Sequence, residues 1–175
     1  MSKKQKTILS VWVEDTPGVL WRVTELFGSQ NFNIESLTVG ATEKPGVARL
    51  TIILGSEEKA LRHLVSDLNR ITNLVQVKTV DPDESVQMEL ALLMVDAPDE
   101  KKTDIINIVN VFRARIVDVA TNSMTVAVSG SPDKVQALHD LLHPFGILEA
   151  VRTGIVAIDR GVRGSAERRK RKDAE

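Results

Sequence analysis

The chain has 175 residues, of which 42% are hydrophobic and 27% charged, and it contains no cysteine. Its length suffices for one ordinary domain or two small ones, and the lack of cysteine excludes disulfides, thiolate metal sites and thiol catalysis. A formal net charge of −1 and only 3% aromatic residues argue against a general nucleic-acid surface. No apolar run approaches the ~20 residues of a membrane span, and no signal peptide is recognisable. We therefore expect a cytoplasmic protein.

The first apolar segment, residues 8–13, is rich in β-branched side chains and predicts a strand. A helix is predicted directly after it, with Thr16 as the N-cap and Pro17 at the first helical position. Gly28 and Asn31 are expected to end this helix, because either can take a left-handed backbone conformation. The apolar stripe of the helix has a period of 3.6 residues and comprises Val19, Leu20, Val23, Leu26 and Phe27.

Residues 33–39 predict a second strand, and the strict alternation from residue 47 to 54 predicts a third, half-buried one. Ser56 is expected to cap a second helix, whose first turn carries acidic side chains. Residues 74–80 predict a fourth strand. The resulting order β-α-β-β-α-β is the ferredoxin-like arrangement. Two helices cover one face of such a sheet, and we expect pairing with a second copy to bury the other face.

The second half of the chain repeats this order after a polar linker at residues 81–85. The fold class predicted is α+β, with two consecutive βαββαβ ferredoxin-like domains at residues 1–80 and 86–160. Residues 161–175 lack large apolar side chains after Val162 and are expected to form a disordered basic tail. The elements expected in the second domain are a strand at 86–95, a helix opened by Pro98, strands at 115–119 and 124–128, a helix opened by Ser131, and a last strand at 150–158.

Catalytic and metal-binding patterns are missing from the sequence. The three histidines, His63, His139 and His143, fall in predicted helices. His139 and His143 are four residues apart and share a helix face, but no third ligand accompanies them. No glycine-rich phosphate motif occurs either. We therefore predict no metal site and no catalytic site, while an enzyme in its own right stays an alternative that turnover by the purified chain would establish.

The turn between the first strand and the first helix has the features of a site for a small zwitterion. The first N–H groups of a helix lack intrahelical partners and carry partial positive charge, so Gly18, Val19 and Leu20 are candidate donors to a carboxylate. Asp15 and the side-chain carbonyl of Asn33 are candidate acceptors for an ammonium group. In this fold Asn33 reaches such a ligand only from another copy of the domain. The alternative is that Asp15 or Thr16 is only a cap and Asn33 only satisfies a turn.

Two motifs carry a resemblance to a known family. D-T-P-G-V-L at residues 15–20 and F-N-I-E-S-L-T-V-G at residues 32–40, followed by a T-E-K-P loop and a strand containing T-I-I, resemble the small regulatory subunit of acetolactate synthase (acetohydroxyacid synthase). The resemblance runs over residues 8–160. It implies that the first half is an ACT domain, a ligand-sensing module, and that the second half is the family's C-terminal ferredoxin-like domain.

The resemblance also implies a function. Such a subunit has no activity of its own, activates the large catalytic subunit, and confers feedback inhibition by valine in branched-chain amino-acid biosynthesis. No cofactor is expected on this chain, and thiamine diphosphate, magnesium and FAD are expected on the catalytic partner. Similar proteins form homodimers through their ACT domains, with valine at the interface. The effector-binding positions carried over are Asp15, Gly18, Val19, Leu20, Asn33, Ile34, Val39 and Gly40.

Three positions depart from the family pattern. Asp15 stands where asparagine is frequent, Trp21 where a small residue is usual, and Asn31 where glycine is usual. Trp21 could narrow the site, which leaves leucine and isoleucine as alternative effectors. Two further alternatives stay open: a free-standing ACT sensor for another biosynthetic enzyme, and nucleic-acid binding by the basic cluster at residues 168–172.

Overall fold

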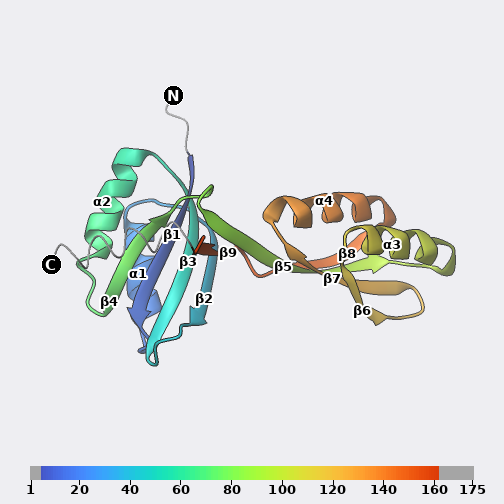
Figure 1. Cartoon of the computed structure of the whole chain (residues 1–175), viewed down its shortest axis with the longest axis horizontal. Coiled ribbons are helices and arrows are strands. Elements are labelled where there is room, and N and C mark those ends of the chain that lie inside the picture. Colours follow the sequence, from blue (N-terminus) through green and yellow to red (C-terminus); the bar gives the residue numbers. More distant parts are fainter. Residues whose placement is uncertain (1–4, 162–175) are drawn as a thin grey trace. The chain divides into compact units, whose positions relative to one another are not determined.

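The computed structural model describes residues 5–161, which form two compact units (Figure 1). The described residues of unit 1 are 5–86 and 155–161, and unit 2 is Gln87–Gly154. The two units have the same element order, so the predicted repeat of a βαββαβ domain is confirmed. The predicted tail beyond Gly161, including the basic cluster at residues 168–172, lies outside the described residues.

Unit 1 contains a four-stranded antiparallel sheet in the order β2-β3-β1-β4. Both helices pack on one face of this sheet, where apolar side chains from the strands and helices form the first core. The elements of unit 1 are β1 (Gln5–Glu14), α1 (Val19–Ser29), β2 (Ile34–Ala41), β3 (Val47–Ser56), α2 (Glu58–Leu68), β4 (Leu74–Val80) and β9 (Val156–Asp159).

Two of the predicted helix caps are wrong. The N-cap of α1 is Gly18, with φ 82°, rather than Thr16, and no side chain caps this helix. The left-handed Gly18 breaks the helical path, so Pro17 lies outside α1. Ser56 does not cap α2, because it ends β3 as a buried residue whose hydroxyl lies 3.3 Å from that of Thr7. Asn31 does adopt the left-handed conformation that was expected after the first helix.

Unit 2 has the sheet order β6-β7-β5-β8, which matches the order in unit 1 strand for strand. Its helices cover one face and enclose the second core. Ser131 caps α4 as expected, because its hydroxyl accepts a hydrogen bond from the Lys134 N–H. The remaining elements of the chain are β5 (Ser85–Asp96), α3 (Asp99–Val111), β6 (Arg115–Val119), β7 (Ser123–Gly130), α4 (Pro132–Leu142), the 3₁₀ turn η1 (His143–Phe145) and β8 (Ile147–Arg152).

The single last strand predicted at residues 150–158 is wrong, because the chain turns in the middle of this apolar run. Gly154, with φ 84°, separates β8 from β9. The second compact unit ends at Gly154. β9 pairs with β5 and belongs to unit 1.

β9 also lies over the face of the unit 1 sheet that was expected to be bare. Ile155 and Ala157 pack against Ile8, Ile53 and Val80 in a separate buried cluster on the face opposite the helices. Figure 1 shows β9 in front of the sheet of unit 1, with α1 behind it. The chain itself thus covers part of the face that we expected a second copy to bury.

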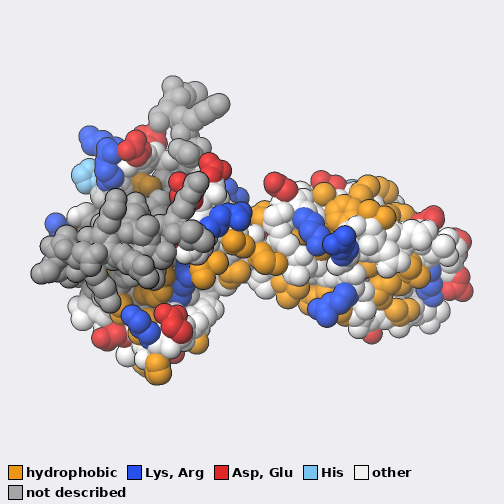
Figure 2. All heavy atoms as spheres, in the orientation of Figure 1, with side chains coloured by type: hydrophobic (Ala, Val, Ile, Leu, Met, Phe, Trp, Pro, Cys, Tyr) orange, Lys and Arg blue, Asp and Glu red, His pale blue; other side chains and the backbone are white. Residues whose placement is uncertain are grey.

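Figure 2 shows one face of unit 2, on which Lys and Arg side chains gather near the middle and Asp and Glu side chains lie mostly toward the margins, with hydrophobic side chains around them. Among residues 5–161, no helix is long and apolar enough to cross a membrane.

The contribution of β9 to unit 1 can be measured with two isoleucines that differ in burial. Ile155 is 6% exposed and Ile158 is 60% exposed. Ile155→Ala is expected to lower the free energy of unfolding by about 2–4 kcal/mol, because it leaves a cavity, whereas Ile158→Ala should change it by less than about 0.5 kcal/mol. Urea unfolding followed by tryptophan fluorescence reports unit 1, since both tryptophans, Trp12 and Trp21, lie there. Equal losses for the two variants would contradict the packing of β9 on the sheet.

Candidate functional site

The turn between β1 and α1 is held by backbone hydrogen bonds. The Asp15 N–H donates to the Gly46 carbonyl oxygen at 2.8 Å, and the Val19 N–H donates to the Thr16 carbonyl oxygen at 3.3 Å. Among the described residues, nothing accepts from the N–H groups of Gly18 or Leu20. Two of the three donors expected from the sequence are therefore available to a ligand, and Val19 is the exception.

Gly18 gives this turn an open approach. A Cβ at Gly18 would meet no atom within 4 Å, so nothing in the described chain covers the backbone there. A positive φ at this position directs the chain into α1 without a side-chain cap. A ligand carboxylate can approach the start of α1, where the helix dipole favours negative charge.

The carboxylates at this corner have different surroundings. Asn73 donates from Nδ2 to Glu14 Oε2 and accepts from Arg22 Nη1 at 2.8 Å. The Glu14 N–H also donates to the Asn73 carbonyl oxygen at 2.9 Å. Glu14 is thus engaged, whereas the exposed Asp15 makes no side-chain hydrogen bond within the described part of the chain. No local sequence pattern indicates this network, because Asn73 comes from the distant turn before β4.

Asn33 lies at the other end of the sheet from Asp15. Ile34 and Thr7 both pair with Leu54, so the start of β2 is level with the start of β1. Asp15 follows Thr7 by eight residues, which at about 3.4 Å per residue places it roughly 27 Å away along the sheet. Asn33 and Asp15 of one chain therefore cannot hold the same amino acid, as the topology predicted.

The alternative interpretation is that the side chains of Asp15 and Asn33 only satisfy local structure. No hydrogen bond of these side chains to another described residue supports it. No side chain caps α1, and the described residues include no hydrogen-bond partner for the amide of Asn33. Asn33 is exposed at the residue before β2. Both polar groups are free to meet a ligand or another chain.

The other candidate residues lie on the edge strand of the sheet and at its two ends. Val39 and Gly40 are exposed on β2, which has a partner on one side only among the described strands. Ile34, at the start of β2, is partly buried against the core. Leu20 is exposed on α1, whereas the side chain of Val19 is buried. The structure therefore groups Asp15, Gly18 and Leu20 at one corner and Asn33 and Ile34 at the opposite end.

The histidines do not form a metal site within residues 5–161. No group of three or more His, Asp or Glu side chains there could hold a metal ion. The rings of His139 and His143 lie 6.2 Å apart between centroids, and Nδ1 of His139 is 3.3 Å from the Asp140 carboxylate. His143 belongs to the 3₁₀ turn η1 rather than to α4, because the helix ends before Pro144.

Comparison with known families defines the class of protein. A family model described as an AHAS small subunit-like ACT domain matches residues 9–76. A second one, described as the small subunit of acetolactate synthase, matches residues 88–161. The chain is thus an ACT-domain regulatory protein with a second ferredoxin-like domain, in agreement with the sheet order of both units.

Individual relatives narrow this class to one family. The chain is 45% identical over 156 residues to the acetolactate synthase small subunit of Mycolicibacterium smegmatis, covering 89% of this chain and 92% of that protein. It is 40% identical over 166 residues to the acetolactate synthase small subunit of Bacillus subtilis, covering 94% and 96% of the two chains. The protein belongs to the acetolactate synthase small-subunit family.

A solved structure supports the same assignment. The acetolactate synthase small subunit from Thermotoga maritima is 34% identical to the chain, with a TM-score of 0.84. The match covers 90% of this chain and 98% of that one. The α+β fold class with two βαββαβ domains is therefore confirmed.

Replacing two glycines near this turn by alanine is expected to change the stability of unit 1 in opposite directions. Gly18→Ala is expected to destabilise unit 1 by about 1–2 kcal/mol, because φ 82° is strained for any residue with a Cβ. Gly28→Ala is expected to stabilise it by about 0.5–1 kcal/mol, because Gly28 lies in α1 in open space. Urea unfolding followed by tryptophan fluorescence measures both changes. Stabilisation by Gly18→Ala would contradict the left-handed turn.

Proposed function

We propose that the chain is a non-catalytic regulatory subunit that activates the large catalytic subunit of acetolactate synthase and confers feedback inhibition by valine. Membership of the small-subunit family supports the partnership. In this proposal thiamine diphosphate, magnesium and FAD belong to the large subunit, and both subunits work in the cytoplasm. The observation that carries the sensing role is the corner of unit 1, where unpartnered backbone N–H groups lie beside the free carboxylate of Asp15.

The corner matches the two charged ends of an amino acid. The N–H groups of Gly18 and Leu20 suit a carboxylate, and the Asp15 carboxylate suits an ammonium group. Val39, which is 47% exposed, offers apolar surface on the edge strand β2, which β3 separates from β1. Trp21, which is 64% exposed on α1, adds a bulky apolar group and leaves leucine and isoleucine as alternative effectors.

A homodimer would remove the separation along the strands between Asn33 of one copy and Asp15 of the other. The outer edge of β2 has unpaired backbone groups among the described strands, which is a template for another strand. If two copies of β2 pair antiparallel about a two-fold axis through the middle of the strand, Ile34 of one copy comes next to Ala41 of the other. The end of β2 at Gly40 is level with Trp12, three residues before Asp15. The partner's Asn33 amide would then lie level with the corner that holds Asp15, on the outer side of β2.

Regulation follows if valine favours one arrangement of this pair. An effector shifts an equilibrium only by its differential affinity for two states. Valine held between two ACT domains stabilises the paired arrangement. This arrangement in turn lowers the activity of the large subunit. The coupling free energy is expected to be about 1–3 kcal/mol, as in other allosteric proteins.

The Asn33 amide provides the sharpest test of the effector site. Asn33→Ala is expected to abolish valine inhibition of the reconstituted enzyme, because the site loses a polar group from the second copy. Stimulation of the large subunit should persist, and calorimetry should show loss of valine binding to the small subunit alone. The matched control is Asn107→Ala on an exposed face of α3, which should keep inhibition. Full inhibition of the Asn33→Ala enzyme would overturn the site.

The partner itself can be tested in cells. A tagged copy of the chain is expected to co-purify the untagged large subunit. Capture of a different biosynthetic enzyme, without the large subunit, would instead support a free-standing ACT sensor. Turnover of acetolactate synthase substrates by the purified chain alone would contradict the non-catalytic role.

A further inference from the structure

The face of unit 1 opposite the helices has two different halves. At one end β9 buries Ile8, Ile53 and Val80. At the other end, Trp12 of β1 lies beside its cross-strand partner Arg49 of β3. A cavity of about 480 Å³ opens over this second half, within the roughly 300–1,000 Å³ typical of small-molecule sites.

Arg49 is the central charged group of this cavity. Its guanidinium lies 4.6 Å from the centroid of the Trp12 ring, and its Nη2 donates to Ser10 Oγ at 2.8 Å and to the Ala157 carbonyl oxygen at 2.6 Å. Both of these acceptors are neutral. Among the described residues, Nη1 has no acceptor, and the buried Nε has none either. A partly buried cation in hydrogen-bond contact only with neutral groups is costly unless an anion joins it.

The acidic residues near the cavity do not supply that anion. Asp159 forms an ion pair with Lys78, and Glu43 lies too far from Arg49 for an ion pair. Burial lowers the pKa of Arg49 from its ordinary value, while Asp159 and Glu43 act on it only through longer-range attraction. With Lys78 and Asp159 neutralised, Lys44 and Arg49 face Glu43, which leaves one positive charge in excess.

Most of the remaining wall of the cavity is apolar, and Gln76 adds one uncharged polar side chain. Trp12, Val47 and Val75 line it, together with Ile158 of β9, whose side chain is largely exposed. The Trp12 ring, fixed by its stack with Arg49, offers a flat surface to an apolar group. An excess positive charge beside apolar walls matches a carboxylate attached to a hydrocarbon group.

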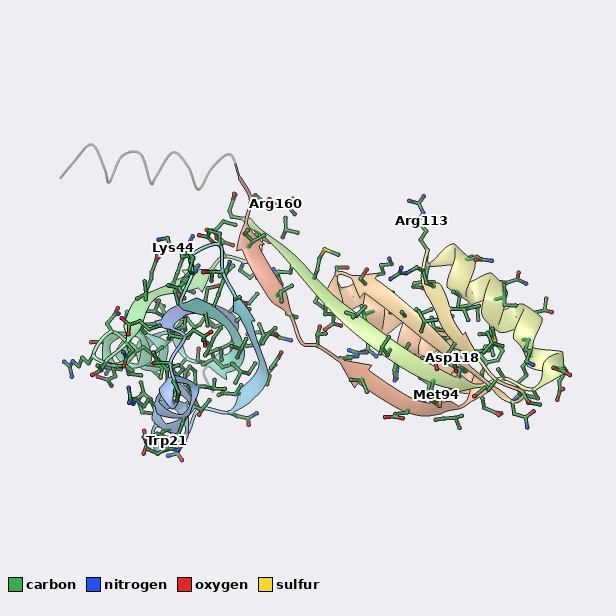
Figure 3. All side chains as sticks on the ribbon, turned by 90° about the horizontal axis from the view of Figure 1, so that it is seen from below. Trp21, Lys44, Met94, Arg113, Asp118 and Arg160 are labelled. Atoms are coloured by element: carbon green, nitrogen blue, oxygen red, sulfur yellow. The ribbon has the colours of Figure 1, made fainter. Side chains whose placement is uncertain are left out.

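We propose that this cavity binds a small organic acid, with Arg49 and Lys44 contacting its carboxylate and with Trp12 and Ile158 contacting its hydrocarbon part. An ammonium group on the same molecule would face the excess positive charge, so the site prefers simple organic acids to amino acids. The site is distinct from the proposed effector corner and needs no second copy. Figure 3 shows Lys44 and Trp21 on opposite sides of unit 1, so the two sites have separate tryptophan reporters.

The test uses the indole N–H signals of the two tryptophans in ¹H–¹⁵N NMR spectra of the full chain. Trp12→Phe assigns the signals. Sodium 3-methylbutanoate is expected to shift the Trp12 signal in a saturable way and to leave the Trp21 signal in place, at constant ionic strength. The uncharged 3-methylbutanamide should shift neither signal, and valine should bind the Trp12 site at least about tenfold more weakly.

Charge variants assign the response to the cavity. Arg49→Gln is expected to weaken 3-methylbutanoate binding by at least about tenfold, and Lys44→Gln to weaken it by about threefold or more. Lys59→Gln on the exposed surface of α2 removes the same charge elsewhere and should bind as the unaltered chain does. Because Arg49 also holds β9, Lys44→Gln decides the matter if Arg49→Gln loses its dispersed spectrum.

Four outcomes would overturn the proposal. They are no saturable shift of Trp12, an equal shift with the amide, equal affinity for valine, and unchanged binding in a folded Arg49→Gln or Lys44→Gln chain. None of them bears on valine regulation, which is tested separately at Asn33. Loss of valine inhibition in Asn33→Ala with retained 3-methylbutanoate binding would show that the two sites are separate.

Discussion

The pairing of β1 and β2 with opposite edges of β3 is the constraint on which the proposed sensing role of unit 1 depends. Both strands run antiparallel to β3, so they are parallel to each other and start at the same end of the sheet. The turn after β1 therefore lies far from the turn before β2. The polar groups at Asp15 and Asn33, which suit one zwitterion, are separated within each chain. An amino acid that needs both can bind only where two copies meet, and such a site reports on the pairing itself.

The segment after Gly154 covers part of the face of the same sheet that lies opposite the helices. Had the last strand continued along unit 2, the cluster around Ile8 and Ile53 would lack its cover from Ile155 and Ala157. A sheet with such a cluster exposed would pair face to face with another copy, because apolar area is the main driving force for association. Cover from its own chain reduces that drive, and the outer edge of β2, which no described strand pairs, is the route to the proposed dimer.

Much of the fold follows from periodicity, because the alternation in β3 and the stripe in α1 reflect burial that tertiary packing then preserves. The fourth strand was predicted with the bounds that the structure shows, Leu74–Val80. The caps at Thr16 and Ser56 were predicted wrongly, because one backbone torsion or one extra strand residue moves a cap. The turn at Gly154 was missed, because the apolar residues on either side of it have the pattern of one continuous strand.

The candidate site was predictable to a different extent at each of its parts. The separation of Asp15 from Asn33 follows from topology alone, so the sequence was sufficient for it. The engagement of Glu14 by Asn73 depends on a side-chain contact between distant turns, and no local pattern indicates it. The cavity at Arg49 was missed for a similar reason. A charged residue in the half-buried strand β3 was the available signal, since charged side chains at such positions are rarely left without a partner.

The loop between β2 and β3 touches both proposed sites and gives a physical route for coupling between them. The Gly46 carbonyl oxygen accepts from the Asp15 N–H, while Lys44, two residues earlier, lines the cavity. The loop is braced by the Thr42 hydroxyl, which donates to the Val47 carbonyl oxygen at 3.0 Å. A ligand that moves Lys44 therefore acts on a loop that is hydrogen-bonded to the turn between β1 and α1, where the proposed effector corner lies. If the two ligands are coupled in this way, each must change the affinity of the other by the same factor, because coupling free energies are reciprocal.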